Sequence, residues 1–476
     1  MATLSEALAA AFELHQSGRL AEADALYARV LEADPGNATA LHLRGLAATQ
    51  ASDAPRAVDL LRAAADAAPD HALIRSNLGA ALRQAGRLAE AEEALRAALA
   101  LDPGRADAAA NLGAVLHALG RHQAARACLE GALALDPDAV PALINLGVVL
   151  TDMGEAARAA DMLGRAVALA PGNAEAEWNL AVALLTAGRW REGWPAFESR
   201  LRRPGVSPER LRAPRWDGSD PRGLTILVHA EQGRGDTIQF ARYVPHLAAR
   251  GAHIILACQP ELARLLATVP GVAGIVPFGS VPPLHDAHCP VMSLPFALEL
   301  DGPPAAPMPY LSADPAAVAA WRGRLPAGAR VGLAWAGAPG NSVDGRRSLD
   351  PALLAPLAAI EGVTWVSLQK APRALPPLPG LVDATAELGD FADTAALVAT
   401  LDLVVSVDTA TAHLAGALGR PVWLLNRWDG CWRWGKGRLD SPWYPRLRQF
   451  RQGVPGDWGP AVAALATALK SWREAR

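Results

Sequence analysis

The amino-acid sequence predicts an α-helical repeat solenoid followed by an α/β region with parallel sheets. Three observations lead to this prediction. A proline recurs every 34 residues in the first part of the chain, at Pro35, Pro69, Pro103, Pro137 and Pro171. Beyond residue 223, short apolar runs alternate with helical patterns, as they do in parallel sheets covered by helices. Tryptophan usage changes as well, because none of the 14 tryptophans precedes Trp178.

The composition is that of a folded protein, with 51% hydrophobic residues, 20% charged residues and a net charge of -3. At roughly 150 residues per domain, the length allows about three domains. The balanced charge argues against a general nucleic-acid-binding protein. Cys128, Cys258, Cys289 and Cys431 are far apart and form no cluster with histidine, so neither a disulfide framework nor a zinc site is predicted. Without an apolar membrane segment or a basic leader, we expect a soluble, cytoplasmic chain.

A period of 34 residues with two helical segments per unit is the tetratricopeptide signature. A glycine shares this period at the turn between the two helices, and Ser52 fills one slot; the glycines are Gly18, Gly86, Gly120, Gly154 and Gly188. A second set lies inside the first helix, where a small residue lets helices approach closely: Gly45, Gly79, Gly113 and Gly147. Because one unit cannot bury its own apolar face, we predict a solenoid of about five and a half units at residues 1–201.

Asparagine occupies one equivalent position on the first helix of four units: Asn77, Asn111, Asn145 and Asn179. One interpretation is a polar residue on a solvated helix face. The functional interpretation is a ladder of amides that holds an extended polypeptide by its backbone, because an amide both donates and accepts hydrogen bonds. The position resembles the asparagine ladder in the repeats of eukaryotic protein O-linked N-acetylglucosamine transferases.

The second region begins after a stretch rich in proline, glycine and charge at residues 202–223, which predicts a linker. Buried strands are then predicted in two sets, at 224–230, 252–259 and 273–278, and at 331–337, 364–370, 401–409 and 421–426. Helical patterns lie between them, at 236–249, 260–268, 351–359, 392–400 and 409–418. We predict two doubly wound domains, 224–328 and 329–476, with ligands at the carboxyl ends of the strands, in the cleft between the domains.

Three predicted strand ends carry residues suited to chemistry. Asp236 follows the first strand and a glycine-containing turn, where it is either an N-cap or a general base. Arg346 and Arg347 lie in a glycine-rich loop after a strand, where they either face solvent or grip phosphate. Thr409 and His413 open a helix whose backbone amides and dipole favour a diphosphate, although such a histidine is as often structural.

Residues 427–451 carry seven basic side chains against two acidic ones, interleaved with aromatic residues. Nucleic-acid binding is one interpretation of this composition. The segment is short and joined to the strand–helix core of a net acidic chain. A loop that folds over the cleft and binds an anionic donor is therefore the simpler interpretation.

Residues 224–452 resemble the bacterial glycosyltransferase family that includes the lipopolysaccharide heptosyltransferases. The matching motifs are GDTIQFARY, GLAWAG, SLQK, DFADTAAL, SVDTATAHLAGALGRPVW, WRW and SPWYP. The resemblance implies a GT-B fold of two facing Rossmann-like domains, with Asp236 as the base of an inverting reaction that needs no metal and no cofactor besides its nucleotide-sugar co-substrate. The residues that it implies for the donor are Arg347, Gln369, Lys370, Asp408, Thr409, Ala410 and His413. Ala410 and Gly345 depart from the family pattern, which leaves the donor sugar open.

Repeats followed by such a transferase resemble bacterial proteins that glycosylate protein acceptors, flagellin among them. The predicted function is transfer of a sugar to a Ser or Thr of a protein that the repeats capture, without nucleic acid or membrane insertion. Two alternatives stay open. One is a non-catalytic scaffold with a vestigial transferase fold. The other is a transferase acting on a lipid-linked glycan, which would need an apolar or strongly basic membrane face that the sequence does not show.

Overall fold

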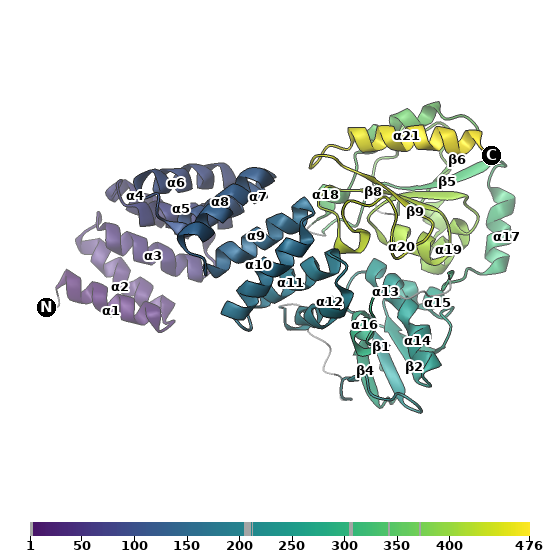
Figure 1. Ribbon diagram of the computed structural model, residues 1–476, viewed down its shortest axis with the longest axis horizontal. Coiled ribbons are helices and arrows are strands. Elements are labelled where there is room, and N and C mark those ends of the chain that lie inside the picture. Colours follow the sequence, from purple (N-terminus) through teal and green to yellow (C-terminus); the bar gives the residue numbers. More distant parts are fainter. Residues whose placement is uncertain (1–2, 204–210, 212, 304–307, 341–342, 371–372) are drawn as a thin grey trace. The chain divides into compact units, whose positions relative to one another are not determined.

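The computed structural model describes residues 3–203, 211, 213–303, 308–340, 343–370 and 373–476. The chain divides into two compact units, Met1–Leu180 and Ala181–Arg476, which we call unit one and unit two (Figure 1). Unit one is helical, and unit two contains two parallel sheets. Within the described ranges, no helix is both long enough and apolar enough to cross a membrane. Part of the predicted linker, 204–210 and 212, lies outside the described residues.

Unit one is built from pairs of helices, one pair for each 34-residue repeat. Its helices are α1 (Leu4–Gln16), α2 (Leu20–Ala33), α3 (Ala38–Gln50), α4 (Ala54–Ala67), α5 (Ala72–Gln84), α6 (Leu88–Leu101), α7 (Ala106–Ala118), α8 (His122–Leu135), α9 (Val140–Met153), α10 (Ala156–Leu169) and α11 (Ala174–Thr186). Helix α11 crosses the border between the units, and its partner α12 (Trp190–Phe197) belongs to unit two. The helical-repeat prediction is therefore confirmed.

Two periodic features of the sequence determine the repeat geometry. The turn between the helices is left-handed, with φ of +74° at Gly120 and +61° at Ser52, which fills a glycine slot. The glycine inside the first helix faces a leucine of the second: a Cβ on Gly147 would lie 2.4 Å from Leu163 Cγ. Because that distance is shorter than carbon atoms tolerate, the helices pack closely only with glycine at this position.

Both sheets of unit two are entirely parallel. The first has the order β3-β2-β1-β4, with β1 (Thr225–His229), β2 (His253–Cys258), β3 (Val272–Pro277) and β4 (Ala287–Pro290). The second has the order β6-β5-β7-β8-β9, with β5 (Ala329–Ala334), β6 (Val363–Ser367), β7 (Leu403–Val407), β8 (Val422–Asn426) and β9 (Leu447–Arg451). Chain order reverses beside β1 and beside β5, so ligands are expected at the carboxyl ends of these strands.

The sequence missed β4 and β9. The end of the predicted basic loop is instead strand β9, which pairs with β8 and buries Leu447, Gln449 and Phe450. The predicted helix at 351–359 is a 3₁₀ helix, η5 (Pro351–Ala359). Pro356 inside it has no N–H to donate, which disfavours a regular α-helix.

The other helices of unit two are α13 (Arg234–Phe240), α14 (Val244–Ala249), α15 (Ala263–Leu266), α16 (Leu294–Ala297), α17 (Pro315–Arg324), α18 (Asp344–Arg347), α19 (Phe391–Val398), α20 (Ala410–Ala417) and α21 (Gly459–Glu474). The remaining 3₁₀ turns are η1 (Glu198–Arg202), η2 (Ala241–Tyr243), η3 (Pro260–Leu262), η4 (Val291–Ser293), η6 (Thr385–Glu387) and η7 (Trp432–Trp434).

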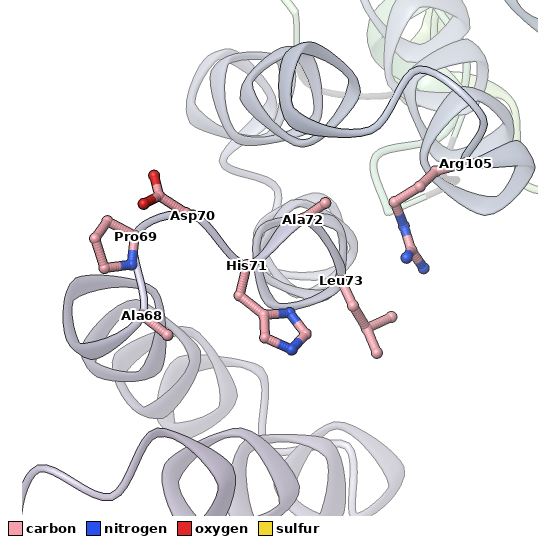
Figure 2. A pocket seen from close by; sticks show the side chains of 7 residues that line it. All are labelled: Ala68, Pro69, Asp70, His71, Ala72, Leu73 and Arg105. Atoms are coloured by element: carbon pink, nitrogen blue, oxygen red, sulfur yellow. The ribbon is translucent and has the colours of Figure 1, made fainter.

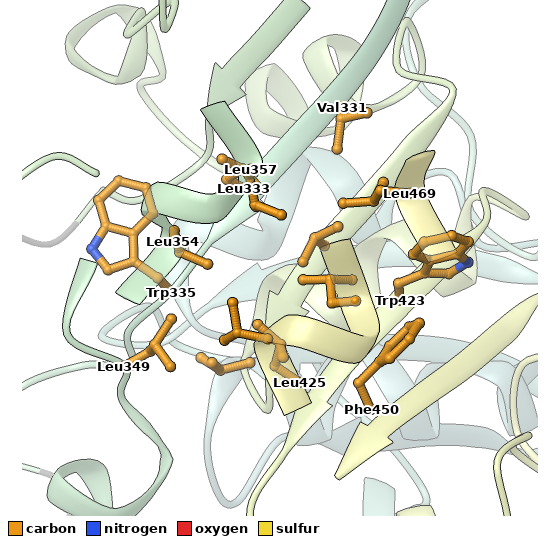
Figure 3. Packing of buried hydrophobic residues seen from close by; sticks show 14 of the residues in the cluster. Val331, Leu333, Trp335, Leu349, Leu354, Leu357, Trp423, Leu425, Phe450 and Leu469 are labelled. Atoms are coloured by element: carbon orange, nitrogen blue, oxygen red, sulfur yellow. The ribbon is translucent and has the colours of Figure 1, made fainter. Parts of the chain in front are cut away.

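The second sheet is covered on one face by α21, drawn in yellow in Figure 1. Leu333 and Leu425 of the sheet lie in this layer with Leu469 of the helix (Figure 3). Val405 and Leu465 belong to the same buried cluster. The central strands β7 and β8 are buried along their whole length, as expected where helices cover both faces of a parallel sheet. This packing fixes the strand ends from which the candidate site is built.

Candidate functional site

The candidate site lies where the starts of two helices meet. Helix α13 follows β1 and helix α20 follows β7, so each begins at the carboxyl edge of its own sheet, and the two pack against each other (Figure 1). A Cβ on Gly235 would lie 3.0 Å from His413 Cδ2 and 3.4 Å from Ala410 Cα. Glycine at this position therefore brings two motifs that are far apart in the sequence into contact.

Asp236 is a partly exposed carboxylate, 24% accessible, whose two oxygens both accept hydrogen bonds. Oδ2 accepts the N–H of Gly233 at 3.0 Å, which ties the side chain to the start of α13. Oδ1 accepts from Nη2 of Arg433 at 2.5 Å. The carboxylate thus has both a helix-start contact and a charged partner in the other half of the unit.

Arg433 lies in η7, and its side chain is buried. Its Nε donates to Gln239 Oε1 at 2.6 Å, and its guanidinium lies 4.5 Å from the ring centre of Trp432. Burial lowers the pKa of Arg433, but Asp236, followed by Cys431, more than offsets this, so its pKa is raised overall. Arg433 is therefore a fixed positive charge beside Asp236. The sequence includes it in the WRW motif and in the basic segment 427–451, but did not pair it with Asp236.

The start of α20 holds the predicted donor residues. Thr409 precedes the helix, with Oγ1 3.0 Å from Ser406 Oγ. His413 is buried, its Nδ1 lies 2.9 Å from Tyr444 Oη, and its ring stacks on Trp434. Burial, followed by the nearby positive charge of Arg433, lowers the pKa of His413 well below its ordinary value. The imidazole is therefore neutral at neutral pH and can offer a hydrogen bond but not a charge.

The other predicted donor residues do not all lie at the start of α20. Arg347 Nη1 donates to the main-chain carbonyl of Asp408 at 3.2 Å, which places both residues beside the start of α20. Gln369 is buried, and its Oε1 accepts the N–H groups of residues 335 and 336 at 3.1 and 2.8 Å, so it holds the chain where β5 ends. Lys370 is exposed, with no hydrogen bond recorded to another described residue.

Further arginines extend this site along the second sheet. The sequence pointed to Arg346 beside Arg347 and to Arg451 in the basic segment 427–451, but it did not single out Arg373. Arg373 donates to Asp344 at 2.6 Å, and Arg346 contacts Asp429. Burial lowers the pKa of Arg451 to about 10. Among the described residues at the carboxyl edge of the second sheet, arginines outnumber aspartates, so this edge favours binding of an anion. These residues follow several different strands, and no local spacing marks them as a group.

An aromatic cluster packs against η7. It comprises residues of α12 and of the segments around η7 and α13: Trp190, Trp194, Phe197, Phe240, Trp432 and Trp443. Trp194 is only 2% exposed, and its ring centre lies 5.9 Å from that of Trp432, the residue before Arg433. Helix α12, the second helix of the last repeat, is thus part of the packing that positions Arg433.

The asparagines of the predicted ladder are all half-buried. Asn77 Nδ2 lies 2.7 Å from Nε2 of His42, which precedes it by one repeat plus one residue. For Asn111, Asn145 and Asn179, no side-chain hydrogen bond to another described residue is recorded. Asn77 therefore already has a partner within the solenoid, whereas the other three amides have none among the residues that the structure describes.

A shallow hollow opens on unit one at the turn between α4 and α5 (Figure 2). Its lining residues are Ala68, Pro69, Asp70, His71, Ala72, Leu73 and Arg105. No predicted site residue is among them. The hollow therefore adds nothing to the site at α13 and α20.

A buried histidine at the end of β1 makes the stability of unit two sensitive to acid. His229 Nε2 lies 3.1 Å from His288 Nδ1, and burial, followed by the neighbouring His288, lowers the pKa of His229 to about 4. Between about pH 6.5 and pH 4, the unfolded chain binds a proton at this site that the folded chain does not. The free energy of unfolding should therefore fall with falling pH, by up to about 1.4 kcal/mol per pH unit.

Urea unfolding at several pH values would test this expectation. Tryptophan emission reports on unit two, because Trp178 is the only one of the 14 tryptophans in unit one. A His229→Gln variant should show a shallower pH dependence than the wild type. An identical slope would mean that His229 titrates normally in the folded protein.

Family models match both parts of the chain. Tetratricopeptide-repeat models match residues 8–72, 82–146 and 144–203. The model of glycosyltransferase family 9 (heptosyltransferase) matches residues 387–425, the segment from η6 to β8 that includes α20. The repeats indicate protein interaction, and the second match points to a glycosyltransferase.

A curated relative extends the comparison. The chain is similar to Protein FlbA of Caulobacter vibrioides, with 32% identity over 327 residues, which cover 60% of this chain and 54% of FlbA. The chain thus spans about half the length of this relative.

Among solved structures, the chain is similar to YrrB, a TPR protein with an unusual peptide-binding site. The TM-score is 0.31 and the identity 24%, covering 36% of this chain and 88% of YrrB. It is also similar to pilF of Pseudomonas aeruginosa, with a TM-score of 0.37 and 20% identity, covering 43% of this chain and 93% of that one.

Proposed function

We propose that this chain is a GT-B glycosyltransferase that moves a sugar from a nucleotide-sugar to a Ser or Thr hydroxyl of a protein held by its repeats. The observation that carries the proposal is the meeting of α20 with α13. The family-9 match covers α20 with His413, and α13 presents Asp236 beside it. Transfer inverts the anomeric carbon and needs no metal. Flagellin is one candidate acceptor by resemblance.

The proposed donor site uses the start of α20 and two arginines. Free backbone N–H groups at a helix start favour a diphosphate, and guanidinium groups grip its oxygens. Arg347 lies beside this start through its contact with the Asp408 carbonyl, and Arg433 through the stacking of its neighbour Trp434 on His413. Negative charge grows on the diphosphate as the bond to the sugar breaks, so these donors stabilise the transition state.

Asp236 is proposed as the base. Its carboxylate takes the proton of the acceptor hydroxyl, the hydroxyl oxygen bonds to the anomeric carbon, and the electron pair of the broken bond leaves with the nucleotide. The donor-free protein holds Oδ1 against Arg433. A bound diphosphate competes for that guanidinium, which weakens its hold on Oδ1 and leaves this oxygen free to take the proton of the acceptor hydroxyl.

Arg347→Ala should weaken the binding of nucleoside diphosphates by about 10- to 100-fold, because it removes a charge-assisted contact. His413→Ala should weaken it by about 2- to 10-fold, since its imidazole is neutral. Calorimetry with a panel of nucleoside diphosphates measures both, and Arg322→Ala, an exposed arginine of α17, is the control. Unchanged affinity in both variants would mean that the donor binds elsewhere.

EDTA should not alter the transfer rate, and activity that depended on added Mn²⁺ would contradict the mechanism.

The ladder is proposed to hold the acceptor. Replacing Asn111 and Asn145 with Ala removes two amide contacts of about 0.5–1.5 kcal/mol each, so acceptor affinity should fall by about 5- to 150-fold. Nucleotide binding should stay unchanged. The control replaces Glu93 and Gln123, exposed residues of α6 and α8, with Ala. Intact-mass analysis of a co-expressed acceptor measures its glycosylation by each double variant. If the two variants glycosylate it equally, the ladder does not take part in binding the acceptor.

A peptide-binding scaffold without activity is the second candidate. It is favoured by the Asp236 carboxylate, since both oxygens already have hydrogen-bond partners. Such a scaffold would bind polypeptide through its repeats and would transfer no sugar from any donor that it binds. Turnover of a single donor would exclude it.

A further inference from the structure

A cluster of metal-ligating side chains lies in unit one, where the proposed transfer reaction does not use it. It consists of His117, His122 and Asp152, and the ligand atoms that they offer all lie within 4.8 Å of one another. His117 Nε2 is 2.7 Å from Asp152 Oδ2, and the two imidazole rings are 5.3 Å apart. All three side chains are half-buried.

The stacking of the repeats creates this cluster. His117 lies in the last turn of α7, and His122 is the first residue of α8, so both stand at the turn within one repeat. Asp152 lies in the last turn of α9, in the next repeat. The separation of His117 from Asp152 is one repeat plus one residue, the same separation that pairs His42 with Asn77. No motif marks the site, which is why the sequence predicted none.

We propose that His117, His122 and Asp152 bind a zinc ion that joins two neighbouring repeats. Two imidazole nitrogens and one carboxylate oxygen suit Zn²⁺, and a tetrahedral ion leaves its fourth position to water. With bonds of about 2.0–2.2 Å, neighbouring ligand atoms stand about 3.3 Å apart. The His117–Asp152 pair would open by about 0.6 Å and the third ligand would approach by up to about 1.5 Å, shifts that side-chain torsions supply.

The helix ends around the cluster also favour a cation. Helices α7 and α9 both end there, and the carbonyl ends of helices carry partial negative charge. Helix α8 begins there and opposes this effect at one of the three positions. The ion would connect α7, α8 and α9. Because it binds the folded arrangement and not the separated ligands, it would stabilise unit one.

Calorimetry of the untagged, chelator-treated full chain with ZnCl₂ tests the proposal. We expect one high-affinity zinc per chain, with affinity lower by about tenfold or more in His122→Ala and in Asp152→Asn. His71→Ala, an exposed histidine at another repeat turn, is the matched control and should bind as the wild type does. Zinc should raise the thermal midpoint of the wild type and of His71→Ala, but not of the two ligand variants.

Wild-type affinity in both ligand variants, or no saturable binding by the wild type, would overturn the site and leave His117–Asp152 as a hydrogen bond only. If a ligand variant fails to fold, the visible absorption spectrum of the wild type loaded with Co²⁺ tests the site instead. Four-coordinate Co²⁺ gives intense visible bands, whereas six-coordinate Co²⁺ gives weak ones. Weak bands alone would overturn the proposal. Zinc should leave nucleoside diphosphate binding unchanged, which separates this outcome from that of the transfer proposal.

Discussion

Replacing Asp236 by Asn should lower the transfer rate by about 100-fold or more, because the amide cannot take the proton of the acceptor hydroxyl. Nucleoside diphosphate affinity should change much less, since Arg347 and the start of α20 remain. Steady-state turnover with saturating donor measures the first effect, and calorimetry the second. A variant that turns over at the wild-type rate would leave Asp236 with a structural role only.

The chain offers a close control for this substitution. Asp393 occupies the same position near the start of α19 as Asp236 does in α13: it accepts the N–H of Gly389 at 2.9 Å and pairs with Arg264 at 3.0 Å. Asp393→Asn therefore removes the same kinds of contact without touching the proposed base. Equal losses of turnover in both variants would mean that helix stability, and not proton transfer, explains the effect.

Trp194→Ala should lower the free energy of unfolding of unit two by about 3–5 kcal/mol, the usual cost of removing a large buried aromatic side chain. Trp194 packs against Trp432, which precedes Arg433, so the loss should also disturb the contact of Arg433 with Asp236 and slow transfer. Trp194→Phe keeps an aromatic ring in the cluster and should recover most of both effects. Urea unfolding and turnover of the same two variants measure them.

The same packing predicts where the chain can be divided. A fragment of residues 181–476 retains α12 and should fold, whereas a fragment of residues 202–476 loses it and exposes the aromatic cluster. The shorter fragment should aggregate or unfold at lower temperature. Equal stability of the two fragments would show that α12 is dispensable and that the cluster contributes little.

The repeat architecture could be predicted because it follows from the regular spacing of residues along the sequence. The 34-residue period identifies the turn at Ser52, whose φ of +61° belongs to the left-handed region although the residue is not glycine. Seven of the strands were predicted from apolar runs. Strand β9 was missed because its sequence, LRQFR, is an edge strand with charged residues, so its composition resembles that of a basic loop.

The site was predictable only in part. Asp236 and His413 follow apolar strands in recognisable motifs, so each half could be found separately. Arg433 is 197 residues from Asp236 and meets it only when the two sheets come together. No sequence motif indicated the proposed zinc site, for the same reason: His117 and Asp152 belong to different repeats. Contacts between distant segments depend on tertiary packing, which local pattern does not encode.

The central claim is that the site at α13 and α20 transfers sugar to a polypeptide presented by the repeats. Intact-mass analysis of candidate acceptor proteins, co-expressed with the full chain or with its Asp236→Asn variant, tests it most directly. We expect an added mass of one or more sugar residues with the wild type and an unmodified acceptor with the variant. An equal added mass with both chains would contradict the claim, as would unmodified acceptors with a wild-type chain that binds and hydrolyses its donor.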